Sequence, residues 1–93
     1  MEIKDDAAMR GLILGALYVG KERKMVLVRS DNFSPPMAMC DIFRIGCEFR
    51  DDELIIGVPS KNGNGYFMRI SVRGKAVWEG REDSKLEISG LSS

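Results

Sequence analysis

The sequence predicts an α+β fold in which an N-terminal helix packs on a small antiparallel β-sheet of four to six strands, rich in hairpins. Helical spacing of apolar residues near the N-terminus predicts the helix, and short β-branched runs separated by turn sequences predict the sheet. The chain has 93 residues, of which 44% are hydrophobic and 30% charged, as in an ordinary globular domain. We therefore expect residues 1–93 to form one domain, with Ser89–Ser93 as a flexible tail.

The first segment, Asp5–Val19, has the pattern of an amphipathic helix. Asp5 or Asp6 can cap its N-terminus, and five apolar residues then fall on one face, namely Met9, Leu12, Ile13, Ala16 and Leu17. Gly11 and Gly15 weaken a helix by about 1 kcal/mol each. A hairpin between Leu12–Val19 and Met25–Arg29 is the competing interpretation.

The middle of the chain contains one strand, one loop and one ambiguous stretch. Met25–Arg29 is short and β-branched, as in a strand, and Ser30–Pro36 is rich in turn formers. Pro35–Gly46 could form a helix capped by Ser34. The alternation of apolar and polar residues over Ile42–Arg50 instead favours a strand, which is the interpretation we adopt.

The remainder predicts further strands. Glu53–Val58 is expected to pair back on Ile42–Arg50 through a tight Asp51–Asp52 turn. Lys61–Gly65 contains two Asn-Gly dipeptides, which favour a turn before a strand at Tyr66–Val72. The chain then forms either a strand or a short helix at Lys75–Trp78, followed by an edge strand at Lys85–Ser89. We expect Trp78 to be at least half buried, because it offers the largest apolar area of any side chain here.

The composition argues against catalysis, metals and cofactors. The chain contains no histidine, which removes the commonest general base and metal ligand. Its two cysteines, Cys40 and Cys47, are expected to be free thiols, with Cys47 on an inward strand position. The acidic run Asp51–Glu53 is expected to diverge into solvent and to bind no metal.

We expect a cytoplasmic protein without a membrane partner. The longest apolar stretch, Gly11–Gly20, is shorter than the roughly 20 residues that a membrane helix needs. Acidic residues precede it, whereas a signal peptide begins with basic ones.

One segment has an excess of positive charge. No acidic residue lies between Leu54 and Trp78, where Tyr66 and Phe67 sit among four basic residues of a predicted hairpin. Such a hairpin can enter a DNA groove or stack on bases, and its candidate contacts are Lys61, Tyr66, Phe67, Arg69, Arg73 and Lys75.

The sequence from Gly65 to Trp78 resembles the wing and following helix of winged-helix DNA-binding proteins, over about a sixth of the chain. The resemblance implies two helices between the first strand and the wing. It also implies a recognition helix within Pro35–Gly46, where Arg44 is the only basic residue.

Two functions follow from these observations. Formal neutrality, with 14 basic and 14 acidic residues, favours a small regulatory or adaptor protein that binds another protein and could form a homodimer. The alternative is a nucleic-acid-binding protein, winged-helix-like or reading through a β-hairpin, that uses the basic Lys61–Lys75 segment.

Overall fold

The computed structural model describes residues 5–20 and 24–91. Over these ranges the elements are α1 (Asp6–Gly20), β1 (Val26–Val28), a 3₁₀ turn η1 (Ser30–Asn32), α2 (Met39–Asp51), β2 (Ile55–Pro59), β3 (Tyr66–Ile70) and α3 (Val72–Trp78). The α+β class and the antiparallel sheet are confirmed. The expected four to six strands are wrong, because the sheet in the described part of the chain has three.

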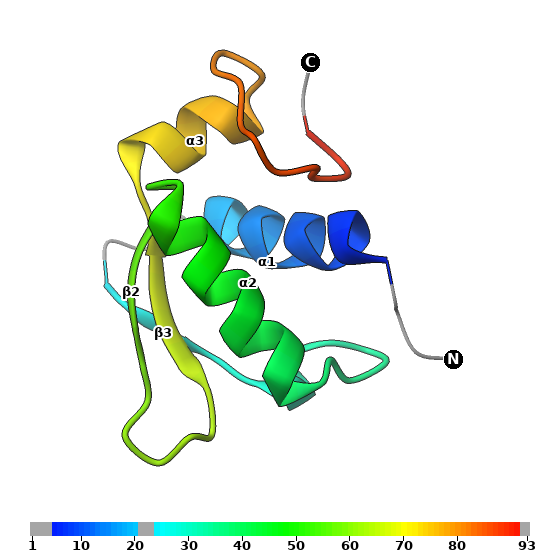
Figure 1. The fold of residues 1–93 in the computed structure, drawn as a ribbon, viewed down its shortest axis with the longest axis vertical. Helices are drawn as coiled ribbons and strands as arrows, with labels where there is room; N and C mark the ends of the chain where they lie inside the picture. The colour runs from blue at the N-terminus through cyan, green and yellow to red at the C-terminus, as the bar shows by residue number, and fades with distance from the viewer. Residues whose placement is uncertain (1–4, 21–23, 92–93) are drawn as a thin grey trace.

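The three strands lie in the order β1-β3-β2, so β3 is central and both of its neighbours are antiparallel to it. Met68 in β3 lies between Val26 of β1 and Gly57 of β2. Helices α1 and α2 both pack against the sheet, and Figure 1 shows α3 beyond the end of β3 that is far from the β2–β3 loop.

The N-terminal helix is confirmed, and the competing hairpin is wrong. The carboxylate of Asp5 caps it by accepting a 3.0 Å hydrogen bond from the backbone N–H of Ala7. Gly11 and Gly15, which lower the helix propensity of this segment, allow other parts of the chain to pack closely on it. A Cβ at Gly11 would lie 2.1 Å from the Ser89 carbonyl oxygen, and one at Gly15 would lie 2.8 Å from the Trp78 ring. Both positions therefore allow the C-terminal part of the chain to approach α1.

The strand expected at Ile42–Arg50 is wrong, because this stretch lies in α2. The apolar residues there fit both the 3.6-residue period of a helix and the two-residue period of a strand, and burial shows which one the chain adopts. Ile42, Ile45 and Phe49 are buried at helical spacing, whereas Cys47, which strand alternation places inside, is exposed. The expected Asp51–Asp52 hairpin turn is likewise the end of this helix. The chain leaves it through Glu53, whose φ of 61° is a common way to terminate a helix.

The C-terminal segment lies along α1 and forms no strand. The interpretation of Lys75–Trp78 as part of a short helix is confirmed by α3, which Ser71 caps by accepting a 2.9 Å hydrogen bond from the Gly74 N–H. The edge strand expected at Lys85–Ser89 is wrong. Ser89 instead donates its N–H to the Ala7 carbonyl at 3.0 Å, and side chains from this segment pack on the core.

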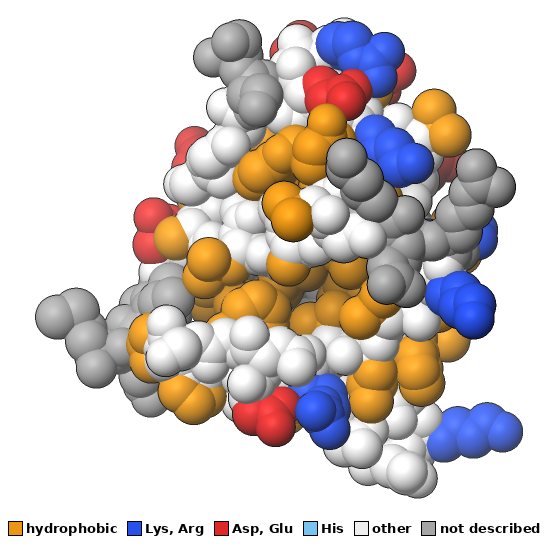
Figure 2. Space-filling view, turned by 180° about the vertical axis from the view of Figure 1, so that it is seen from behind, with side chains coloured by type: hydrophobic (Ala, Val, Ile, Leu, Met, Phe, Trp, Pro, Cys, Tyr) orange, Lys and Arg blue, Asp and Glu red, His pale blue; other side chains and the backbone are white. Residues whose placement is uncertain are grey.

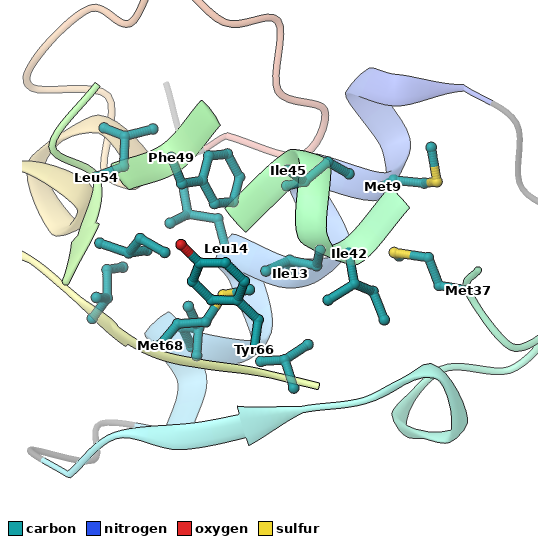
Figure 3. Packing of buried hydrophobic residues seen from close by; sticks show 14 of the residues in the cluster. Met9, Ile13, Leu14, Met37, Ile42, Ile45, Phe49, Leu54, Tyr66 and Met68 are labelled. Carbon is teal, nitrogen blue, oxygen red and sulfur yellow. The ribbon is translucent and has the colours of Figure 1, made fainter. Parts of the chain in front are cut away.

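The core lies between the sheet and the two long helices (Figure 3). Its fully buried side chains come from α1, α2, β3, α3 and the chain between α2 and β2, and include Met9, Ile13, Leu14, Ile42, Ile45, Phe49, Leu54, Tyr66, Met68 and Val77. Trp78 packs against this core and is more than half buried, as expected. No helix in the described part of the chain is long and apolar enough to cross a membrane.

Candidate functional site

The basic hairpin exists, but its candidate contacts do not converge. Lys61 is exposed in the loop between β2 and β3, whereas Lys75 is exposed on α3 beyond the other end of β3. The five residues of β3 alone separate them by about 13 Å of strand. Figure 1 shows the hairpin loop at the bottom of the molecule and α3 near the top. A single short contact therefore could not use both lysines.

Tyr66 lies inside the protein and offers no surface for stacking. Its side chain is fully buried, with its ring between Gly46 of α2 and Gly57 of β2. A Cβ on either glycine would lie 2.9 Å from a ring atom, so both glycines are needed for this packing. Among the described residues the hydroxyl has no partner in hydrogen-bond geometry, although the Cys47 thiol is close enough to act on its pKa. Burial raises the pKa of Tyr66, and the neighbouring Cys47 thiol raises it further.

Arg73 is held by acidic and carbonyl groups of the protein itself. Its guanidinium donates to a carboxylate oxygen of Asp52 at 3.2 Å and to a carboxylate oxygen of Glu82 at 2.8 Å. Ser84 donates its hydroxyl to the other Asp52 oxygen at 2.6 Å. Partial burial alone would raise the pKa of Asp52, but the hydrogen bonds from Ser84 and Arg73 outweigh it and hold the pKa below its usual value. This cluster ties the C-terminal segment to the end of α2.

The helix that the winged-helix resemblance would assign to recognition carries little available positive charge. Arg44 lies on α2, but its guanidinium donates to Asp6 and to Asp41, each at 3.0 Å. The same helix exposes Cys40 and Cys47, both of which are free thiols. Arg50, the residue before the last of α2, is the other basic residue of this helix and is exposed.

The outer face of the sheet is mostly apolar, with Arg69 of β3 lying directly across from Ile56 of β2 as its charged residue within the three strands. Leu27, Phe67 and Val58 lie directly across from one another on β1, β3 and β2, and Ile56 is on the same face of β2. We call these four residues the outer sheet patch. Phe67 is 36% exposed, Ile56 50% and Val58 54%, while Leu27 is half-buried. Helices α1 and α2 pack on the opposite face, since Tyr66 and Met68 point toward them.

A groove of about 330 Å³ lies between α1 and β1. It is mostly apolar, and its lining includes Ile13, Leu17, Val28, Phe33, Met68 and Ile70. Its polar lining residues are Lys24, Asn32 and Arg69. In the view from behind, hydrophobic side chains gather around a hollow in the middle of the molecule (Figure 2).

The three side chains of the acidic run at the end of α2 do not converge on one point. Asp52 is engaged by Arg73 and Ser84, while Asp51 and Glu53 are exposed. Across residues 5–20 and 24–91, no three Cys, Asp or Glu side chains are grouped so that they could hold a metal ion.

Comparison with protein-family models, with curated protein sequences and with solved structures found no match for this chain. The outer sheet patch and the groove were both missed by the sequence analysis. A signal for the patch was present, because three of the four outward positions on β2 and β3, Ile56, Val58 and Phe67, are apolar, whereas a solvated sheet face normally carries polar residues like the fourth, Arg69.

Proposed function

We propose that this chain is a non-enzymatic regulatory or adaptor protein that binds another protein through the outer sheet patch. The observation that carries the proposal is the row of apolar side chains across all three strands, Leu27, Phe67 and Val58, of which Val58 is 54% and Phe67 36% exposed. An antiparallel sheet with one solvated face normally carries polar residues on that face. Apolar residues at these positions are typical of a face that a partner covers.

The chemistry of the patch suits a protein partner. Phe67 lies at the centre of the row, flanked by aliphatic side chains on both neighbouring strands. A central aromatic side chain surrounded by apolar contacts is the common arrangement of an interface hot spot. The four side chains of the patch are uncharged and contribute to affinity by excluding water from apolar surface, and Arg69 lies beside them across from Ile56.

The test replaces Val58, which is 54% exposed, with Lys. The matched control is Val72→Lys, because Val72 is 85% exposed on α3 and lies outside the patch. Each tagged variant is used to capture proteins from a cell extract, and a captured protein is then purified and titrated. We expect wild type and Val72→Lys to bind it equally, and Val58→Lys to bind at least about tenfold more weakly. Equal binding by all three proteins would contradict the proposal.

Nucleic-acid binding is a second candidate, favoured by the order of the elements. The hairpin of β2 and β3 is followed by α3, as the winged-helix resemblance implies, and α2 lies between β1 and that hairpin. The resemblance calls for two helices there, and the described chain has α2 and the 3₁₀ turn η1. The burial of Tyr66 and the ion pairs of Arg73 weigh against this candidate.

Salt dependence tests the second candidate. Retention on immobilised DNA and RNA would be measured from low to high salt for wild type and for a variant with Lys61→Gln and Lys75→Gln. A nucleic-acid-binding protein should lose affinity steeply with salt, and the double variant should show a shallower slope. Absence of retention at low salt would remove this candidate.

A further inference from the structure

The hydroxyl of Tyr66 is a buried donor that lacks an acceptor. The side chain is fully buried, and among residues 5–20 and 24–91 nothing accepts from its hydroxyl in hydrogen-bond geometry. Buried polar groups are nearly always hydrogen-bonded, because a donor that is withdrawn from water and left unpaired costs free energy. A neighbouring group that becomes a strong acceptor in another chemical state of the protein would account for this donor.

The ring of Tyr66 extends from β3 toward α2 (Figure 3). Phe43 of α2 contacts the ring edge-on, with the ring centroids 5.9 Å apart, and a Cβ on Gly46 would lie 2.9 Å from a ring atom. Cys47 follows Gly46 directly in the helix. Burial raises the pKa of Tyr66, and the nearby Cys47 thiol raises it further. The thiol therefore lies near the end of the ring that carries the hydroxyl.

Cys47 is accessible to small molecules from solvent. It is exposed on α2, and its sulfur is a free thiol. A thiol is a poor partner for Tyr66, because its sulfur is only a weak hydrogen-bond acceptor. Besides burial and Cys47, Arg50 lowers the pKa of Tyr66 and Asp51 raises it, but neither is hydrogen-bonded to the hydroxyl. The sulfur of Cys47 is thus the atom at which a small chemical change could create the acceptor.

We propose that Cys47 is a site of oxidation to sulfenic acid by hydrogen peroxide, and that the Tyr66 hydroxyl holds the added oxygen by donating a hydrogen bond to it. The thiolate sulfur attacks one peroxide oxygen, so that an S–O bond forms while the O–O bond breaks. The sulfur is oxidised and the peroxide is reduced, and the hydroxide that leaves takes up a proton to become water. Tyr66 keeps its own proton throughout. Sulfenic acid is the reversible first step of cysteine oxidation, since thiols return it to the reduced state.

Cys40 provides a comparison within the same chain. It is also an exposed free thiol of α2, seven residues before Cys47. Seven residues correspond to about 10 Å along a helix axis, so the Tyr66 hydroxyl cannot serve both sulfur atoms. A sulfenic acid at Cys40 should therefore form without any help from Tyr66.

The experiment follows the sulfenic acid of one cysteine at a time. Cys40→Ser leaves only Cys47, Cys47→Ser leaves only Cys40, and each is prepared with and without Tyr66→Phe. A pulse of hydrogen peroxide is removed, a cyclic dione that labels sulfenic acids is added after increasing delays, and mass spectrometry measures the labelled fraction. The sulfenic acid of Cys47 should last at least about threefold longer with Tyr66 than with Phe, which is the effect of one ordinary hydrogen bond. The sulfenic acid of Cys40 should last equally long in both backgrounds.

A second measurement leaves Tyr66 unchanged. The urea midpoint of the Cys40→Ser protein is compared before and after oxidation of Cys47. The midpoint should rise on oxidation, because the buried hydroxyl then gains a partner in the folded state. The Cys47→Ser protein, treated in the same way, should keep its midpoint.

Any one of three results would overturn the proposal. Cys47 that takes no dione label after peroxide is not an oxidation site. Equal lifetimes with Tyr66 and with Phe, or an equal change at Cys40, would mean that the hydroxyl does not hold the oxygen. A urea midpoint that oxidation leaves unchanged or lowers would mean the same. None of these results bears on the proposed protein binding, because α2 packs on the face of the sheet opposite the outer sheet patch.

Discussion

Replacing Tyr66 with Phe should stabilise the protein. The phenol is fully buried and its hydroxyl has no hydrogen-bond partner within the described residues. A buried hydroxyl without a partner costs about 1–3 kcal/mol of desolvation. Removing the oxygen leaves a gap on the order of 15 Å³, which costs about 0.4 kcal/mol at ~24 cal/mol per Å³. The net expectation is a gain of about 1 kcal/mol, while the ring stays in place between Gly46 and Gly57.

Urea unfolding followed by circular dichroism measures this gain. With a slope of about 1–3 kcal/mol per M for a small domain, the midpoint should rise by roughly 0.3–1 M. The gain should also grow in alkaline solution. Because burial raises the pKa of Tyr66 above its ordinary 10.0, the folded state keeps its proton where the unfolded chain loses it. Wild-type stability therefore falls as pH rises above about 10, and the variant lacks this loss. A loss of 1 kcal/mol or more on substitution would refute the reasoning and indicate that the hydroxyl is hydrogen-bonded.

Further substitutions test the packing and the ion-pair cluster. Gly46→Ala should lower the free energy of unfolding, measured in urea, by about 1–2 kcal/mol, because the new Cβ would lie 2.9 Å from the Tyr66 ring. This loss should outweigh the better helix propensity of Ala, and a gain in stability would contradict the packing. Trp78→Ala should cost about 3 kcal/mol, and a loss below about 1 kcal/mol would mean that its ring is not part of the core. Ser84→Ala should cost about 1 kcal/mol near pH 7 through loss of its hydrogen bond to Asp52. Since the pKa of Asp52 is lowered in the folded protein, that cost should shrink as pH falls below about 4, and a constant cost across pH would argue against the hydrogen bond.

The parts of the fold that the sequence predicted correctly are those with one dominant local pattern. Asp5 caps a helix with a clear 3.6-residue period, and both Asn-Gly dipeptides fall between β2 and β3. The sequence misled where two periods coincide. In α2 the residues Ile42, Ile45 and Phe49 fit a helix, yet Phe43, Ile45, Cys47 and Phe49 also fit a strand. Only the packing against β2 and β3 distinguishes them.

Long-range packing also explains the glycines of α1. Read locally, Gly11 and Gly15 weaken a helix. Their use depends on Ser89 and Trp78, which are more than sixty residues away in the sequence. Long-range pairing also decides which candidate nucleic-acid contacts are available. The sequence identifies Arg73 as basic but does not indicate that Asp52 and Glu82 form ion pairs with it. Such pairs become visible only once the chain is folded.

Binding of a protein partner through the outer sheet patch is tested most directly by a chemical-shift map of the ¹⁵N-labelled chain during titration with the captured protein. If the patch is the binding surface, backbone amide shifts should change little in the loop around Lys61 and most at the four patch residues, Leu27, Ile56, Val58 and Phe67. Changes confined to α2 and to that loop, produced by nucleic acid and absent with protein, would contradict it.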